Sequence, residues 1–273
     1  MLSELALLSS PLRAFAEAHR GNVSACALLA VFALREGAAS ASAWMPYVKG
    51  VLEPALSEAA ELPCTWPADS KRLQRLSEEG RRKAAQLRAQ LLAQHAALFP
   101  AAFEAHGAQL APEGVDAAGH PHADTDVPSP SVYEAAGFAD PETAAAADRR
   151  AALEALYSAE AFVAMCAVLI ARGIERTVRA APPRAPGSAA TKGGGDDLAC
   201  VPHFDLCNYA ASPREGLQLR FDSARYRVLC TAKEALAEGD ELLYHYGKKE
   251  REDFLQNYGF VPDTPGHPGE AIV

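Results

Sequence analysis

Apolar positions divide the chain into a helix-patterned first two-thirds and a strand-patterned end. Residues 25–34 form an uninterrupted apolar run, ACALLAVFAL, which predicts a buried core helix. Asn22 or Ser24 would cap its start and Gly37 would stop it. A bilayer span needs about 20 apolar residues, so this run is too short to cross a membrane. We therefore expect a helix inside the protein.

Two longer stretches also carry helical spacing. Within residues 70–98 leucines recur at near-helical intervals, interrupted by Gly80, and basic side chains crowd the other faces. A solvated helix surface explains those charges more simply than an acidic partner does. Residues 141–178 repeat the helical pattern with larger side chains: Leu153, Leu156, Tyr157, Phe162, Met165, Leu169 and Ile170.

The predicted fold is α+β, with a mainly helical region at residues 1–178 and a small β-rich segment at residues 197–262. Residues 105–130 are rich in Pro, Gly, Ala and Asp and predict a mobile loop within the helical region. Low-complexity sequence predicts a flexible linker at residues 179–196. Residues 263–273 are expected to form a tail.

Composition and charge narrow the function. The chain of 273 residues is 49% apolar and 22% charged, which is ordinary for a globular protein. Its net charge of 26 − 35 = −9 argues against a nucleic-acid binder and is compatible with a basic peptide partner. Six cysteines without a CxxC pair favour a reduced, intracellular protein. The first residues, MLSELALLSS, lack the basic start of a signal peptide.

A metal site is a weak alternative. Cys200, His203 and Cys207 lie close together in the sequence, and Cys230 or His245 would be a fourth ligand. The spacing is irregular for zinc, and cysteines in apolar runs are usually small core residues. We therefore expect no metal.

Two sequence blocks near the C-terminus carry the candidate chemistry. In the second block, the turn pair Gly239-Asp240 precedes residues 241–246, ELLYHY, whose apolar and aromatic composition predicts a strand. Alternation along that strand places Tyr244 and Tyr246 on one face. Gly247 leaves room for a ligand behind Tyr246, but a cross-strand aromatic ladder explains the same pattern and is favoured by the pattern alone.

The first block reads Val201-Pro202-x-x-Asp205-x-x-Asn208. The residue before a proline avoids the helical region, so the block should begin extended. Asp205 and Asn208 then have two interpretations. They form a local turn or helix cap, or Asn208 and the backbone around it hold an adenine-bearing cofactor.

Together the blocks resemble the second half of a SET domain, in the branch with the RuBisCO large-subunit lysine methyltransferase and the actin-histidine methyltransferase. That family has V-P-x-x-D-x-x-N-H and G-[ED]-E-[LIV]-x-x-x-Y-G, followed by Y-G-F, which here is residues 258–260. Residues 44–47, WMPY, and 62–66, LPCTW, resemble the family's helical insertion. Arg172 matches the arginine of its V-x-S-R-x-F motif, with Ala171 in place of the serine. Trp44 and Tyr47 are interpreted as packing residues.

The resemblance implies an S-adenosylmethionine-dependent protein methyltransferase, and a protein-lysine N-methyltransferase before any other. It implies that the cofactor is bound by Arg172, Asp205, Asn208, Tyr209 and Phe260, and that Tyr246 and Tyr258 line the methyl-transfer channel. The partner would be a protein substrate bearing a lysine or histidine, with no nucleic acid, membrane or metal.

The chain departs from the family at several points. Tyr209 replaces the family's histidine, and nothing resembling the first SET segment or the C-terminal substrate-binding domain is found. We therefore expect a truncated member. The alternative is a non-catalytic interaction module built on a SET remnant.

Overall fold

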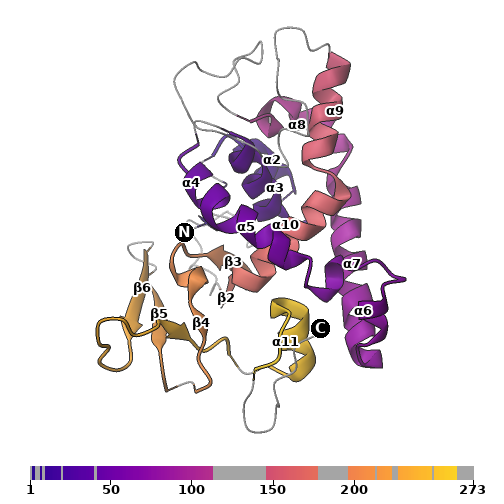
Figure 1. Ribbon diagram of the computed structural model, residues 1–273. Coiled ribbons are helices and arrows are strands. Elements are labelled where there is room, and N and C mark those ends of the chain that lie inside the picture. The colour runs from indigo at the N-terminus through magenta and orange to yellow at the C-terminus, as the bar shows by residue number, and fades with distance from the viewer. Residues whose placement is uncertain are drawn as a thin grey trace, which may run out of the picture.

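The structure, a computed structural model, describes residues 2–3, 7, 10–19, 21–39, 42–112, 146–177, 196–212, 214–222, 227–247 and 249–262. A helical body lies beside two small sheets, and the helix nearest the C-terminus packs under the body (Figure 1). The predicted α+β class is confirmed. The helices are α2 (Arg13–His19), α3 (Ala25–Ala38), α4 (Met45–Tyr47), α5 (Glu53–Ala59), α6 (Lys71–Gln74), α7 (Glu78–Leu98), α8 (Ala101–Leu110), α9 (Ala146–Leu156), α10 (Ala159–Arg172) and α11 (Arg251–Tyr258), with a π-helical turn η1 (Val48–Leu52) and 3₁₀ turns η2 (Pro63–Thr65) and η4 (Phe204–Leu206).

Helices α3 and α10 form the centre of the core. The predicted helix at residues 25–34 is confirmed as α3, whose side chains from Ala27 to Leu34 are all buried. Ser24 caps it, because the Ser24 Oγ accepts a hydrogen bond from the Ala27 backbone N at 3.2 Å. Gly37 does not stop the helix, which ends one residue later at Ala38.

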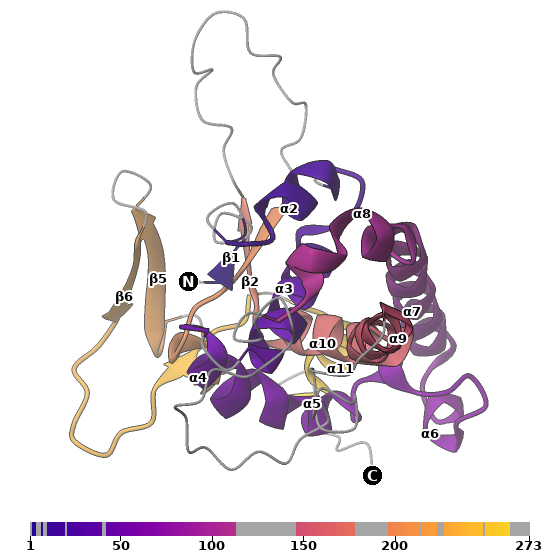
Figure 2. The same cartoon turned by 90° about the horizontal axis from the view of Figure 1, so that it is seen from above.

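Within Arg150–Arg172, an 18-residue window has the mean hydropathy of a membrane span, 1.7, but 56% of that window is buried inside the protein. The second half of this region, α10, packs against α3, α5 and α7 (Figure 2). These contacts account for its apolar character as part of the core.

Two predicted boundaries differ from the structure. Residues 70–98 form α6 and α7, separated by Arg75–Ser77, because Ser77 caps the second helix through a 2.9 Å bond from the Gly80 N. Residues 105–110, expected in a mobile loop, form the end of α8. Residues 113–130 of that loop lie outside the described residues, as do the linker except Asp196, which begins β3, and the tail at residues 263–273.

The first sheet has the order β1 (Leu2–Ser3), β3 (Asp196–Cys200), β2 (Ile174–Thr177), and all its pairs are antiparallel. Strand β2 follows α10 after a single residue, Gly173. Within the described residues, the helical pattern predicted over 141–178 forms two helices, α9 and α10. Helix α10 ends at Arg172, and residues 174–177 form a strand.

The second sheet brings the two sequence blocks together. Its order is β4 (Asn208–Tyr209), β7 (Leu243–Tyr244), β5 (Leu217–Asp222), β6 (Arg227–Ala232). Strands β4 and β7 are parallel, with Asn208 opposite Leu243 and Tyr209 opposite Tyr244. Only two residues of the strand predicted over 241–246 pair in this way. Strand β7 lies between β4 and β5, so a late segment completes a sheet begun by earlier ones.

Gly173 permits the sharp change from α10 to β2. A Cβ at this position would lie 2.4 Å from the Leu169 carbonyl oxygen and 2.5 Å from Leu198 Cδ1. The first of these atoms belongs to the backbone, which cannot rotate away. The junction therefore requires a residue without a side chain, and it fixes Arg172 at the helix end.

We expect Gly173→Ala to lower the free energy of unfolding by about 1–3 kcal/mol, because the added methyl forces a backbone shift. Gly50→Ala is the matched control, since a Cβ at Gly50 meets no atom within 4 Å. Alanine there should be neutral or stabilising by up to about 1 kcal/mol. Urea unfolding followed by circular dichroism measures both, and equal stability of the two variants would contradict the prediction.

Candidate functional site

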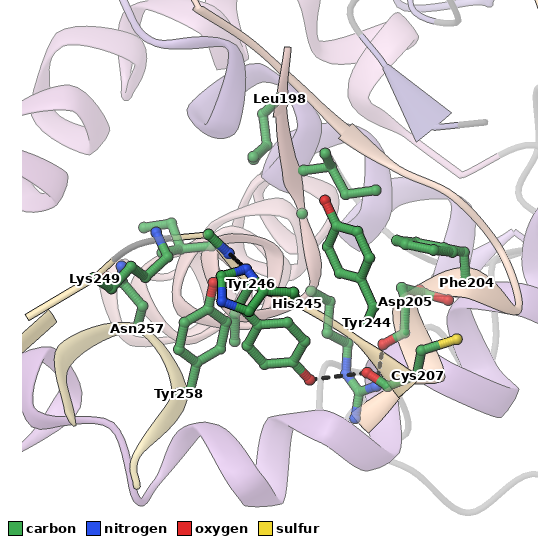
Figure 3. Close-up of a pocket in the computed structure, with 16 residues that line it drawn as sticks. Leu198, Phe204, Asp205, Cys207, Tyr244, His245, Tyr246, Lys249, Asn257 and Tyr258 are labelled. Atoms are coloured by element: carbon green, nitrogen blue, oxygen red, sulfur yellow. Dashed lines mark hydrogen bonds between the residues drawn. The ribbon is translucent and has the colours of Figure 1, made fainter. Parts of the chain in front are cut away.

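A pocket of about 400 Å³ opens where the end of α10, the turn η4, the segment after β7 and α11 meet (Figure 3). It is lined by residues 170–174 and Leu198, by Phe204, Asp205 and Cys207, and by Tyr244, His245, Tyr246, Gly247, Lys249, Asn257 and Tyr258. Four of the predicted site residues therefore line this pocket: Arg172, Asp205, Tyr246 and Tyr258.

Arg172 is the last residue of α10, and its side chain is only 17% exposed. Its Nη2 donates to Glu58 Oε2 at 2.8 Å, and its Nη1 donates to the Asp205 backbone oxygen at 3.2 Å. A guanidinium with these partners has a fixed orientation, and an anionic group in the pocket would meet a preformed donor.

Asp205 presents one bonded and one unbonded carboxylate oxygen. Its Oδ2 accepts a hydrogen bond from the Tyr47 hydroxyl, while its Oδ1 is buried and has no hydrogen-bond partner among the described residues. Burial raises the pKa of the Asp205 carboxyl above its ordinary value, and the Tyr47 bond and the Arg172 charge oppose that rise. A buried unpaired oxygen beside a pocket is suited to accept a donor from a ligand.

Aromatic rings form the remaining wall. The Tyr246 hydroxyl donates to the Cys207 backbone oxygen at 2.8 Å, and its ring lies 4.6 Å from the Tyr258 ring, centroid to centroid. The Phe204 and Tyr244 rings meet edge to face at 4.5 Å. Burial raises the pKa of Tyr246, so its hydroxyl is neutral at neutral pH. The pocket thus combines aromatic faces with a neutral hydroxyl.

Tyr209 and Phe260 lie behind this wall. The Tyr209 ring is 5.5 Å from Tyr246 and 6.5 Å from Phe260, and Phe260 is 6.2 Å from Tyr258. Neither of them is among the residues that line the pocket. Tyr209, Tyr246, Tyr258 and Phe260 therefore form one aromatic cluster, and two of its members, Tyr246 and Tyr258, line the pocket.

Asn208 points elsewhere. Its side chain is exposed, and its Nδ2 donates to Glu241 Oε1 at 2.6 Å, in the segment before β7. It does not line the pocket, although the resemblance implies a cofactor contact there.

Three residues of the site were not found from the sequence. Tyr47, which we interpreted as a packing residue, bonds Asp205 from 158 positions away. Glu58 pairs with Arg172 from α5. Lys249 lines the pocket with its Nζ 5.9 Å from the Tyr258 ring centroid, a cation–π arrangement. No local pattern signals these contacts, because each depends on how distant segments pack.

The possible metal cluster does not form in the described part of the chain, where no three His, Cys, Asp or Glu side chains converge on a metal position. Cys200 is fully buried in β3, and Cys230 is exposed on β6.

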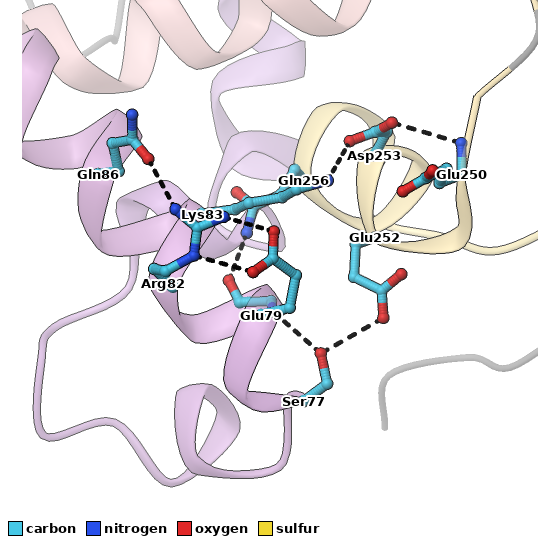
Figure 4. A network of polar contacts seen from close by, with 10 residues as sticks. Ser77, Glu79, Arg82, Lys83, Gln86, Glu250, Glu252, Asp253 and Gln256 are labelled. Atoms are coloured by element: carbon cyan, nitrogen blue, oxygen red, sulfur yellow. Dashed lines mark hydrogen bonds and ion pairs between the residues drawn. The ribbon is translucent and has the colours of Figure 1, made fainter.

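Helix α11, which carries Tyr258, is held against α7 by polar contacts (Figure 4). Lys83 Nζ lies 2.7 Å from Asp253 Oδ1, and Gln256 Nε2 donates to the Gly80 carbonyl at 3.0 Å. Asp253 also closes a capping box with Glu250 at the start of α11. These contacts fix one wall of the pocket to the helical body.

Comparison of the chain with family models, with curated proteins and with solved structures found no match.

The Lys83–Asp253 contact gives a pH prediction. The hydrogen bond from Lys83 lowers the pKa of the Asp253 carboxyl below its ordinary 3.8. A lowered pKa in the folded state means that this stabilisation is present above pH 3.8 and is lost as the pH falls through the folded value. We expect Asp253→Asn to lower the free energy of unfolding by less than about 1 kcal/mol at pH 7, because the side chains of Lys83 and Asp253 are both partly exposed.

Urea unfolding at several pH values measures this effect. The stability of Asp253→Asn should fall less steeply with acid than that of the wild type. Asp69→Asn, at an exposed aspartate before α6, is the control and should follow the wild type. Identical acid profiles for Asp253→Asn and the wild type would contradict the assignment.

Proposed function

We propose that the protein is an S-adenosylmethionine-dependent protein methyltransferase of the SET type, acting on a lysine or histidine side chain. One observation carries the proposal. The parallel pairing of β4 with β7 joins the two sequence blocks that resemble the SET domain, and Arg172, Asp205, Tyr246 and Tyr258 then lie around one pocket.

The pocket chemistry fits the cofactor. Its volume of about 400 Å³ is within the usual size of small-molecule sites. Arg172 would bind the carboxylate, and the unpaired Asp205 Oδ1 would accept the amino group. The rings of Tyr244, Tyr246 and Tyr258 would face the positive charge of the sulfonium, which aromatic faces attract. When bound, the cofactor supplies an electrophilic methyl group.

The residues of the chain would orient the attack. The Tyr246 hydrogen is directed to the Cys207 carbonyl, so the lone pairs of its oxygen remain free to accept an N–H from the incoming nitrogen. That contact would direct the nitrogen lone pair toward the methyl carbon. A free lysine amine has a pKa of about 10.4 and must lose its proton before it can attack. Catalysis would rest on alignment within a largely aromatic channel.

A non-catalytic interaction module is the second candidate. The exposed position of Asn208, and the absence of Tyr209 and Phe260 from the pocket lining, favour it. It predicts that the pocket does not bind the cofactor.

The first test is isothermal titration with S-adenosylmethionine. We expect saturable binding to the wild-type chain and at least a tenfold loss in Arg172→Met, because a guanidinium–carboxylate contact is among the stronger hydrogen-bonded pairs. Arg82→Met is the matched control, since the Arg82 side chain is 62% exposed and bonds Glu79 on the surface of α7. Absence of binding to the wild type would support the interaction module.

The second test separates binding from chemistry. Tyr246→Phe keeps the ring and removes the hydroxyl, so it should bind the cofactor nearly as the wild type does. Loss of one hydrogen bond that orients the reacting nitrogen should slow methyl transfer about 10²-fold. Transfer from labelled S-adenosylmethionine to a library of lysine- and histidine-bearing peptides measures the rate. An unchanged rate would remove Tyr246 from the mechanism.

A further inference from the structure

Tyr47 links the helical body to the pocket. It is the last residue of α4, and its hydroxyl donates to Asp205 Oδ2. Its ring meets Trp44 edge to face at 6.3 Å, and Trp44 in turn meets Phe32 of the core helix α3 at 6.0 Å. Burial raises the pKa of the Tyr47 hydroxyl, so the group is a neutral donor at every physiological pH. The phenol is therefore both rigidly held and protonated.

The two carboxylate oxygens of Asp205, a residue that lines the pocket, have different partners. Oδ2 accepts the hydrogen bond from Tyr47, whereas Oδ1 is buried and accepts no hydrogen bond from the described residues. Arg172 donates to the backbone oxygen of Asp205 and to Glu58. Asp205 Oδ1 thus has no donor within the described part of the chain, so a donor from a ligand would complete the carboxylate.

We infer that Tyr47 is a positioning residue, which holds the Asp205 carboxylate so that Oδ1 forms a subsite for the protonated amino group of a ligand in the pocket. The neighbouring Arg172 suits the carboxylate of the same ligand, because the two charged groups of an α-amino acid are attached to one carbon. The inference rests on the proposed function, in which that ligand is S-adenosylmethionine.

Several charged and titratable groups surround Asp205 and act on the pKa of its carboxyl. Tyr47 faces it from α4, Arg172 from α10 and Cys200 from β3, and His203 and Cys207 lie in its own segment. Burial raises the pKa of the Cys200 thiol, which therefore stays neutral beside it. Among these groups, Tyr47 supplies the one hydrogen bond to the carboxylate that a single substitution removes without changing charge.

The test compares Tyr47→Phe with the wild type in the ligand-free state. Carbon-13 NMR of the aspartate carboxyls gives the pKa of Asp205, and its signal is assigned by its loss in Asp205→Asn. Without the phenol, the ionised carboxylate loses a stabilising donor, so the pKa should rise by roughly one unit. Tyr157→Phe is the matched control, because the Tyr157 hydroxyl donates to the Leu110 oxygen at 2.8 Å inside the helical core. It should leave the Asp205 titration unchanged.

Titration with S-adenosylmethionine across the pH range in which the NMR experiment shows Asp205 to titrate gives the second readout. An amino group binds the ionised carboxylate, so affinity should be lost as the pH falls through the pKa of Asp205. In Tyr47→Phe this loss should occur at a pH higher by the same roughly one unit. A merely structural role would weaken binding equally at every pH. If Tyr47→Phe does not fold, Asp205→Asn replaces it, and its residual binding should be weak and independent of pH.

The outcomes separate the two proposals. An unchanged Asp205 pKa in Tyr47→Phe overturns the positioning role, whether or not the cofactor binds. A raised pKa together with no binding to the wild type overturns the proposed function and the amino-group subsite, while the positioning of Asp205 by Tyr47 stands. A raised pKa with a matching shift of the binding profile supports both.

Discussion

The insertion of β7 between β4 and β5 is the constraint on which the rest of the site depends. The ladder is very short, two residues against β4 and one against β5. Gly216 makes the insertion possible. It has φ +75°, and a Cβ there would lie 2.3 Å from the Leu243 carbonyl oxygen. A residue with a side chain would hold β7 away from β5 and separate the two sequence blocks.

So short a ladder needs support from side chains. The aromatic cluster around Tyr246 supplies part of it, because Tyr209 from β4, Tyr258 from α11 and Tyr246 after β7 pack on one another. Aromatic pairs of this kind contribute about 0.5–1.5 kcal/mol each beyond their buried area. Two rings of this cluster, Tyr246 and Tyr258, also line the pocket, so packing that supports the sheet also shapes the pocket wall.

Much of the helical fold could be predicted from the sequence, because it depends on local pattern. The run at residues 25–34 and the Ser24 cap suffice to locate α3. The boundaries of short elements depend on distant contacts. The turn after α10 needs Gly173 because Leu169 and Leu198 leave no room for a side chain there. The predicted strand at 241–246 is reduced to Leu243–Tyr244, because only those residues pair with other strands.

In the candidate site too, some residues were singled out from the sequence and others depend on distant contacts. The resemblance singled out Arg172, Asp205, Tyr246 and Tyr258 from the sequence, and all four line the pocket. Asn208 has the same kind of motif position but an exposed side chain, since the direction of a side chain on a two-residue strand is set by its neighbours. Tyr47 lies in an apolar segment where an aromatic residue usually only packs, and nothing local reveals a partner 158 residues away.

These distant contacts give the helical region a part in the chemistry of the pocket. Tyr47 from α4 bonds Asp205, Glu58 from α5 bonds Arg172, and Lys83 from α7 holds the helix that carries Tyr258. A buried carboxylate or guanidinium without partners is strongly disfavoured, so the positions of both charges depend on donors and acceptors that the helices provide. The C-terminal sheet brings the site residues together, and the helical body sets their orientation and charge. A change in the packing of α4 or α5 would therefore alter the pocket without touching any residue of the two sequence blocks.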